Sequence, residues 1–150
     1  MADMCELRVL DARVPMRDGT HLATDVTLVD DGQARPALLV RTPYSRAGLR
    51  AAHDPIASAR TGWAVVLQDV RGRGESDGVF RPFAQEVEDG FDAVTWCAEQ
   101  PWCDGRVAMT GMSYNGATQW LAALGRPPAL KAIAPSVIGP DLRASFAFTG

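Results

Sequence analysis

The chain has 150 residues, 47% of them hydrophobic, which is enough to fill the core of one ordinary domain and argues against disorder. Its 15 basic and 18 acidic residues give a net charge of -3, without the basic patch that binding to nucleic acid or to an anionic membrane requires. A small-molecule or short-peptide substrate is therefore expected, with neither nucleic acid nor membrane as a partner.

The cysteines and the N-terminal segment favour a cytoplasmic protein. Cys5, Cys97 and Cys103 are odd in number and widely spaced, so they indicate neither a zinc site nor a disulfide framework, and free thiols are typical of a reducing compartment. The N-terminal segment has no apolar run of signal-peptide length, and no stretch approaches the ~20 apolar residues of a membrane span. No cofactor is expected, because Lys131 is the only lysine and lies outside any phosphate-binding motif.

In chain order, the first predicted element is an antiparallel hairpin. Residues 7–14 and 22–28 flank an Asp18-Gly19 pair, and these residue types form tight hairpin turns. In the second of these segments, apolar and polar side chains alternate with the period of a half-buried strand.

Short apolar runs and helical patterns then alternate along the chain. Strands are predicted at residues 37–40, 64–67, 107–109 and 132–134, because uninterrupted apolar runs are typical of strands covered on both faces. Helices are predicted at roughly residues 50–60, 85–99 and 113–124. The acidic residues of 86–92 are expected to form a solvated helix N-terminus that complements the helix dipole. This order predicts an α/β fold with a mostly parallel sheet, an N-terminal antiparallel hairpin and helices on both faces.

The segment VAMTGMSYNGATQW, residues 107–120, indicates an apolar strand that turns sharply into a helix at Ser113. Hydrolases present a nucleophilic serine on such a bend, which needs small neighbours, and Gly111 and Gly116 supply them. The backbone N–H of Tyr114 then points to where an oxyanion would form, whereas the Tyr114 ring is expected only to shape the pocket wall. The alternative is that Ser113 merely caps the following helix.

Four segments match a known family: RTPYSR at residues 41–46, QDVRGRGESDGVF at 68–80, WCDGRVAMTGMSYNGATQW at 102–120 and KAIAPS at 131–136. The chain resembles the X-Pro dipeptidyl-peptidase and cocaine esterase family of serine hydrolases, and the segments follow that family's order over nearly the whole chain. The resemblance implies an α/β-hydrolase core with Ser113 as the nucleophile. It also implies an oxyanion hole in which a tyrosine hydroxyl, at the position of Tyr44, joins the backbone N–H of Tyr114.

The position of Tyr44 agrees with this role on physical grounds. In α/β-hydrolases the second oxyanion donor comes from the loop after the third strand, and Tyr44 follows the predicted strand 37–40 behind the stiff Pro43. A tyrosine hydroxyl is protonated at neutral pH, so it can donate a hydrogen bond to developing negative charge. One such donor contributes roughly 3 kcal/mol of transition-state stabilisation.

The other members of a catalytic triad do not follow in this sequence. In this fold an acid and then a histidine come after the serine, but no histidine follows Ser113, and the only later acidic residue is Asp141. His21 and His53 lie upstream, where we expect them on the surface and without a route to the serine. The family carries a helical cap after the sixth strand and a C-terminal β-sandwich. The resemblance therefore implies that residues 1–150 are the N-terminal part of a longer catalytic domain and are inactive alone.

Two alternative functions stay open at this point. A non-catalytic interaction or scaffold module would retain the bend at Ser113 as a relic, and the missing triad members favour it. An NAD-type oxidoreductase would use Gly72, Gly74 and Gly78, but the sequence FRP at residues 80–82 interrupts the helix that must start directly after a dinucleotide-binding loop. We therefore expect these glycines to form a structural loop near the active-site rim.

Overall fold

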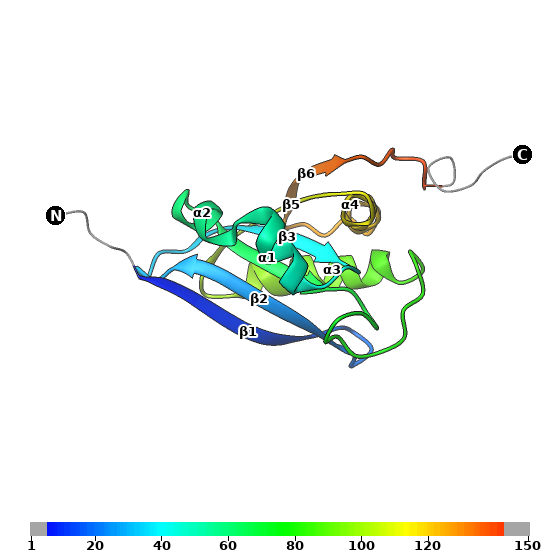
Figure 1. The fold of residues 1–150 in the computed structure, drawn as a ribbon, viewed down its shortest axis with the longest axis horizontal. Helices are drawn as coiled ribbons and strands as arrows, with labels where there is room; N and C mark the ends of the chain where they lie inside the picture. Colours follow the sequence, from blue (N-terminus) through cyan, green and yellow to red (C-terminus); the bar gives the residue numbers. More distant parts are fainter. Residues whose placement is uncertain (1–5, 143–150) are drawn as a thin grey trace, which may run out of the picture.

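A single mixed sheet forms the centre of the computed structural model, which describes residues 6–142. Its strands are β1 (Leu7–Pro15), β2 (His21–Val29), β3 (Arg35–Thr42), β4 (Ala64–Asp69), β5 (Cys103–Met112) and β6 (Leu130–Ser136). They lie in the order β1-β2-β4-β3-β5-β6 (Figure 1). The strands β4, β3, β5 and β6 run parallel, whereas β2 is antiparallel to both β1 and β4.

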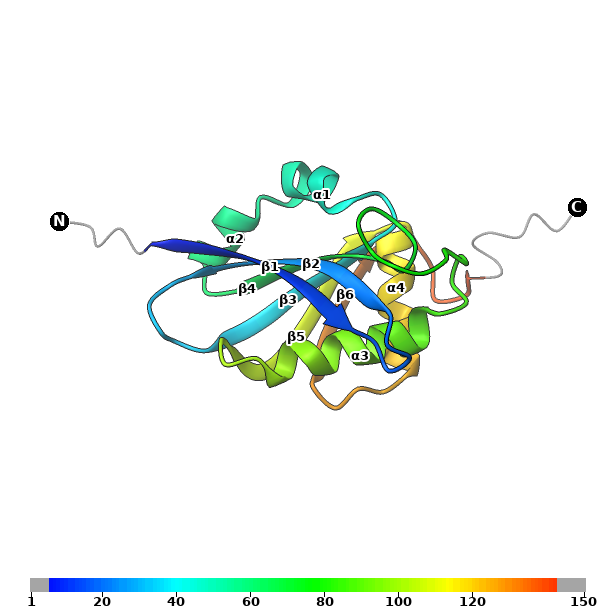
Figure 2. The same ribbon diagram turned by 90° about the horizontal axis from the view of Figure 1, so that it is seen from below.

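Helices cover both faces of this sheet. They are α1 (Arg46–His53), α2 (Pro55–Arg60), α3 (Glu86–Glu99) and α4 (Tyr114–Leu124). The pair α1 and α2 lies on one face, and α3 and α4 pack together on the other (Figure 2). The predicted α/β fold with a mostly parallel sheet is confirmed. Within residues 6–142, no helix is long and apolar enough to pass through a lipid bilayer.

The opening hairpin forms as predicted around its Asp-Gly turn. Gly19 adopts a φ of 84°, a left-handed conformation that costs glycine little, and the Asp18 carboxylate accepts a hydrogen bond of 3.0 Å from the Thr20 N–H. Pairing then continues without a break from Pro15 opposite His21 to Leu7 opposite Val29. The hairpin thereby extends the parallel part of the sheet at the β4 side.

The central strand β3 explains why both faces of the sheet carry apolar side chains. Successive side chains of a strand point to opposite faces. Leu39 belongs to the core formed with α3 and α4, and the next residue, Val40, belongs to the core formed with α1 and α2. Because β3 lies between β4 and β5, the carboxyl ends of these three parallel strands meet at one edge of the sheet.

The helix predicted at residues 50–60 is instead two helices, and it begins earlier than predicted. Helix α1 starts at Arg46, and the helical conformation ends at Asp54, which has a φ of 35° and a ψ of 73°. The cause is Pro55, because a residue before proline is disfavoured in the α conformation and proline is well accommodated in the first turn of a new helix. The Asp54 carboxylate then accepts a hydrogen bond of 3.0 Å from the Ala57 N–H and caps α2.

Strand β6 forms one edge of the sheet, and among residues 6–142 nothing pairs with its outer side. Unpaired backbone groups on an edge strand promote association with other chains. We therefore expect the 150-residue chain to self-associate, and Ala132→Lys on β6 to shift it towards monomer. Sedimentation velocity measures the degree of association of the wild-type chain and of the variant. Ala57→Lys on α2 is the control, because it adds the same charge away from the edge strand. A monodisperse wild-type chain would contradict this expectation.

Candidate active site

The bend between β5 and α4 holds a serine in a strained backbone conformation. Ser113 stands alone between Met112, the last residue of β5, and Tyr114, the first residue of α4. Its φ of 54° and ψ of -123° lie in a region that non-glycine residues rarely occupy. The Ser113 side chain makes no capping hydrogen bond to α4, so helix capping does not account for this serine.

Two glycines make the bend possible, as the sequence predicts. At Gly111, which has a φ of 135°, an added Cβ would lie 2.6 Å from the Cβ of Asn115. At Gly116, an added Cβ would overlap the Ile138 side chain and lie 3.3 Å from the Ser136 carbonyl oxygen. A larger residue at Gly111 would therefore push α4 away from the end of β5, and one at Gly116 would push it away from the end of β6.

Hydrogen bonds fix the bend to the neighbouring strand. The Ser113 N–H donates to the Ser136 carbonyl oxygen at 2.9 Å, which ties the serine to the end of β6. The buried Gln119 amide donates to the Gly111 carbonyl oxygen at 3.1 Å, and its Oε1 accepts a hydrogen bond of 2.9 Å from the Ala134 N–H. The role of Gln119 could not be recognised from the sequence, because α4 contains other buried polar side chains as well.

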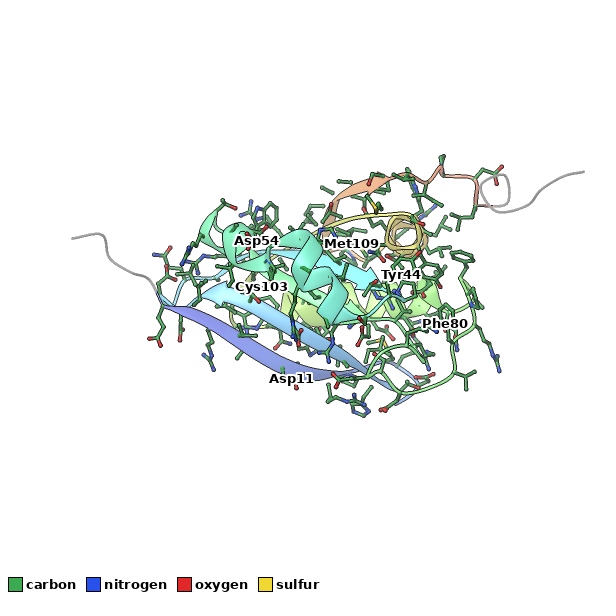
Figure 3. All side chains as sticks on the ribbon, in the orientation of Figure 1. Asp11, Tyr44, Asp54, Phe80, Cys103 and Met109 are labelled. Carbon is green, nitrogen blue, oxygen red and sulfur yellow. The ribbon has the colours of Figure 1, made fainter. Side chains whose placement is uncertain are left out.

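A pocket of about 550 Å³ lies at this edge of the sheet, and both the predicted nucleophile and the predicted tyrosine donor line it. Ser113 lines it from the bend, and Tyr44 lines it from the segment after β3. Figure 3 shows Tyr44 close to the carboxyl end of β3. The remaining lining residues come from α1, from the end of β5, from the start of α4 and from the end of β6: Gly48, Leu49, Ala52, His53, Thr110, Gly111, Met112, Asn115 and Ser136.

The segment that carries Tyr44 is held by short polar contacts. The Tyr44 N–H donates to the Thr42 hydroxyl at 3.0 Å, and Nε of Arg73 donates to the Pro43 carbonyl oxygen at 3.0 Å. The Tyr44 side chain itself is 59% exposed, so its ring faces the pocket and solvent rather than the core. A fixed backbone with an accessible side chain is the arrangement that a hydrogen-bond donor to a substrate needs.

The side chain of Tyr114 is placed differently from the expectation that it shapes the pocket wall. It is buried, it is not among the residues that line the pocket, and its ring stacks on Phe83 with centroids 4.6 Å apart. Its hydroxyl donates to Oε1 of Glu86 at 3.0 Å and accepts a hydrogen bond from the Phe83 N–H at 3.0 Å. Burial and the nearby Glu86 carboxylate raise the pKa of Tyr114, so its hydroxyl stays protonated.

Two acidic residues in the first turn of α3 are buried, although the prediction was a solvated helix start. Glu86 and Asp89 are 4% and 2% exposed. An oxygen of the Glu86 carboxylate lies 2.7 Å from Nη1 of Arg41, and one of the Asp89 carboxylate lies 2.6 Å from Nη2 of Arg71. For these two residues the expectation was wrong, because their side of the first turn faces the sheet and the glycine-rich loop, where two arginines neutralise the carboxylates. Glu88, on the other side of the turn, is exposed as expected.

The two histidines differ in position. His21 begins β2 and is exposed, as expected for a solvated strand residue. His53, at the end of α1, lines the same pocket as Ser113. It does so together with other residues of α1, and the structure shows no hydrogen bond between His53 and Ser113, so the expectation that His53 is not the base stays a prediction.

The glycine-rich stretch forms an irregular loop. Gly72, Gly74 and Gly78 all have positive φ values, and the next helix begins only at Glu86. A dinucleotide-binding loop would lead directly into a helix, so the predicted structural role is the one that the geometry supports. In the described part of the chain, no three histidine, cysteine, aspartate or glutamate side chains are grouped as metal ligands.

The sequence of this chain matches a known family over most of its length. The sequence profile described as X-Pro dipeptidyl-peptidase (S15 family) matches residues 18–150. The chain belongs to this family. The X-Pro dipeptidyl-peptidase family consists of serine hydrolases, and the predicted membership is confirmed.

Individual proteins that are similar to this chain support the assignment. Cocaine esterase from Rhodococcus sp. (strain MB1 Bresler) is 45% identical over 133 residues, which are 86% of this chain and 23% of the relative. An aminopeptidase from a marine sediment Thaumarchaeota archaeon superposes with a TM-score of 0.78 at 29% identity, covering 92% of this chain and 27% of that one. A CocE/NonD family hydrolase from Staphylococcus aureus gives a TM-score of 0.77 at 26% identity, covering 85% and 27%. The chain thus spans about a quarter of the length of these proteins.

Proposed function

We propose that this chain carries the nucleophile and the oxyanion hole of an acyl hydrolase that acts on an ester, an amide or a short peptide. The observation that carries the proposal is that Ser113, on a strained bend, and Tyr44, from a distant segment, line one pocket. In this assignment the Tyr44 hydroxyl and the Tyr114 backbone N–H are the two donors of the oxyanion hole.

The reaction then follows the acyl-enzyme route. Oγ of Ser113 attacks the substrate carbonyl carbon while its proton passes to a base, and the carbonyl oxygen becomes an anion that accepts hydrogen bonds from Tyr44 and the Tyr114 N–H. Collapse of this intermediate breaks the ester C–O or amide C–N bond, and the leaving group takes the proton from the base. Water then attacks the acyl-enzyme, which releases the acid and restores the serine hydroxyl.

The base and its acidic partner are proposed to come from chain beyond residue 150. No histidine follows Ser113 in these 150 residues, and the chain spans only about a quarter of the length of its relatives. Loss of the base removes most of the rate enhancement, so we expect no measurable turnover from the 150-residue chain alone. The proposed substrates include esters, amides and X-Pro peptides.

An active-site label tests the nucleophile directly. In the full-length protein, a fluorophosphonate probe is expected to modify wild type and to leave Ser113→Ala unmodified, because only a hydroxyl at this bend can form the phosphonyl ester. Mass spectrometry of the peptide that contains residue 113 locates the label. Equal labelling of the two proteins would end the hydrolase proposal and favour a non-catalytic interaction module.

A further inference from the structure

A buried chain of polar contacts connects the two segments that carry the proposed oxyanion donors. The Tyr114 hydroxyl donates to one oxygen of Glu86 at 3.0 Å, and the other Glu86 oxygen accepts a hydrogen bond of 2.7 Å from Nη1 of Arg41. Arg41 also donates through Nε to Oε1 of Gln68 at 2.8 Å. These contacts therefore start at Tyr114 and end at Arg41 on β3, three residues before Tyr44.

Stability alone does not explain this ion pair. The side chains of Arg41 and Glu86 are 0% and 5% exposed, so both charges have been removed from water. Nη2 of Arg41 is also buried, and no partner for it lies among residues 6–142. A buried pair with an unsatisfied donor contributes little to the free energy of unfolding compared with apolar residues of the same size. The pair fixes positions instead.

The position that it fixes is the spacing between the two donor segments. On one side, Arg41 occupies the end of β3, and the chain from there to Tyr44 is stiffened by Pro43 and by the hydrogen bond from the Tyr44 N–H to Thr42. On the other side, the Tyr114 ring is clamped between Glu86 and the stacked Phe83, so its backbone N–H has little freedom. Donors to an oxyanion must be held to within about 0.5 Å.

We propose that Glu86, by binding Arg41 and the Tyr114 hydroxyl with its two oxygens, is the positioning residue that sets the geometry of the oxyanion hole. This inference rests on the proposed function of Ser113, Tyr44 and Tyr114. Glu86 does not touch the substrate. It acts through the two segments that do, and it explains why a charged side chain lies in the first turn of α3 facing the sheet.

The variant Glu86→Gln tests the inference with little change in size. A carboxylate accepts hydrogen bonds at both oxygens, whereas an amide accepts at one only, so either Arg41 or Tyr114 must lose its acceptor. In the full-length protein, kcat for a p-nitrophenyl ester is expected to fall roughly 10- to 100-fold with KM nearly unchanged. A boronic acid, which forms a tetrahedral adduct with the serine, is expected to bind more weakly by a similar factor.

A matched control lies one turn further along α3. Asp89 is similarly buried and binds Arg71 through both oxygens, at 2.9 and 2.6 Å, and it forms no hydrogen bond with Tyr114 or with β3 in the described part of the chain. Asp89→Asn is therefore expected to lower the urea midpoint about as much as Glu86→Gln while leaving kcat within about twofold of wild type. If both variants lose kcat in proportion to their stability, Glu86 has only a structural role and the inference fails.

Two further measurements separate this inference from the proposed function. Tyr114→Phe is expected to lower kcat as Glu86→Gln does, and the double variant is expected to be no slower than either single variant, because the same link is broken. Additive losses of kcat would show that Glu86 and Tyr114 act independently.

Hydrogen exchange in peptides spanning residues 41–46 and 111–118 can be measured whether or not the protein is active. Both peptides should exchange faster in Glu86→Gln, and neither should in Asp89→Asn. A wild-type protein without esterase activity would end the proposed function, while unchanged exchange would end this inference.

Discussion

Replacing Ser113 with alanine or with glycine in the full-length protein is expected to lower kcat roughly 10⁶-fold, because neither variant can form an acyl-enzyme. The residual rate comes from binding and from the oxyanion hole alone. Hydrolysis of a p-nitrophenyl ester, measured with enough protein to detect the residual rate, gives this loss. Turnover within tenfold of wild type in either variant would show that another residue is the nucleophile.

The same two variants are expected to differ in stability. At a φ of 54° and a ψ of -123°, alanine keeps the strain of the wild-type serine, whereas glycine has no Cβ and relieves it. Relief contributes about 1–3 kcal/mol, and the greater freedom of glycine in the unfolded chain removes about 0.5–1 kcal/mol of that. Urea unfolding should therefore give Ser113→Gly the higher free energy of unfolding. A less stable glycine variant would mean that the bend is not strained.

Tyr44→Phe in the full-length protein is expected to lower kcat roughly 100- to 1000-fold, the usual effect of removing one oxyanion donor. KM should change little, because the hydroxyl binds the charge that develops during the reaction more strongly than it binds the neutral carbonyl. The ring stays in place and the side chain is 59% exposed, so the unfolding midpoint should not move. An unchanged kcat would remove Tyr44 from the mechanism and would mean that another group is the second oxyanion donor beside the Tyr114 N–H.

The parts of the fold that local signals specify could be predicted from the sequence. The Asp18-Gly19 turn, the apolar runs of β3 and β4 and the bend at Ser113 each depend on residues within a few positions of one another. The sequence also places Tyr44 after the third strand, and the adjacency of β3 and β5 then brings it to the pocket of Ser113. The roles of these residues in catalysis stay predictions.

The parts that depend on tertiary contacts could not be predicted. Glu86 and Asp89 look like a solvated helix start, because their partners Arg41 and Arg71 lie 45 and 18 residues away along the chain. The one available signal was the charged side chain of Arg41 at the end of an apolar strand. The division of the predicted helix 50–60 has a local signal, since Pro55 disfavours the α conformation at Asp54.

The hydrogen bond from the Ser113 N–H to Ser136 on β6 has a consequence for synthesis of the protein. The strand that holds the serine in its bend is made twenty residues or so after the serine itself, and parallel pairing of distant segments forms slowly. During synthesis, the segment that carries Ser113 therefore lacks this hydrogen bond until β6 has left the ribosome and paired with β5. The strained bend at Ser113 is therefore expected to reach its final conformation only after β6 has been synthesised.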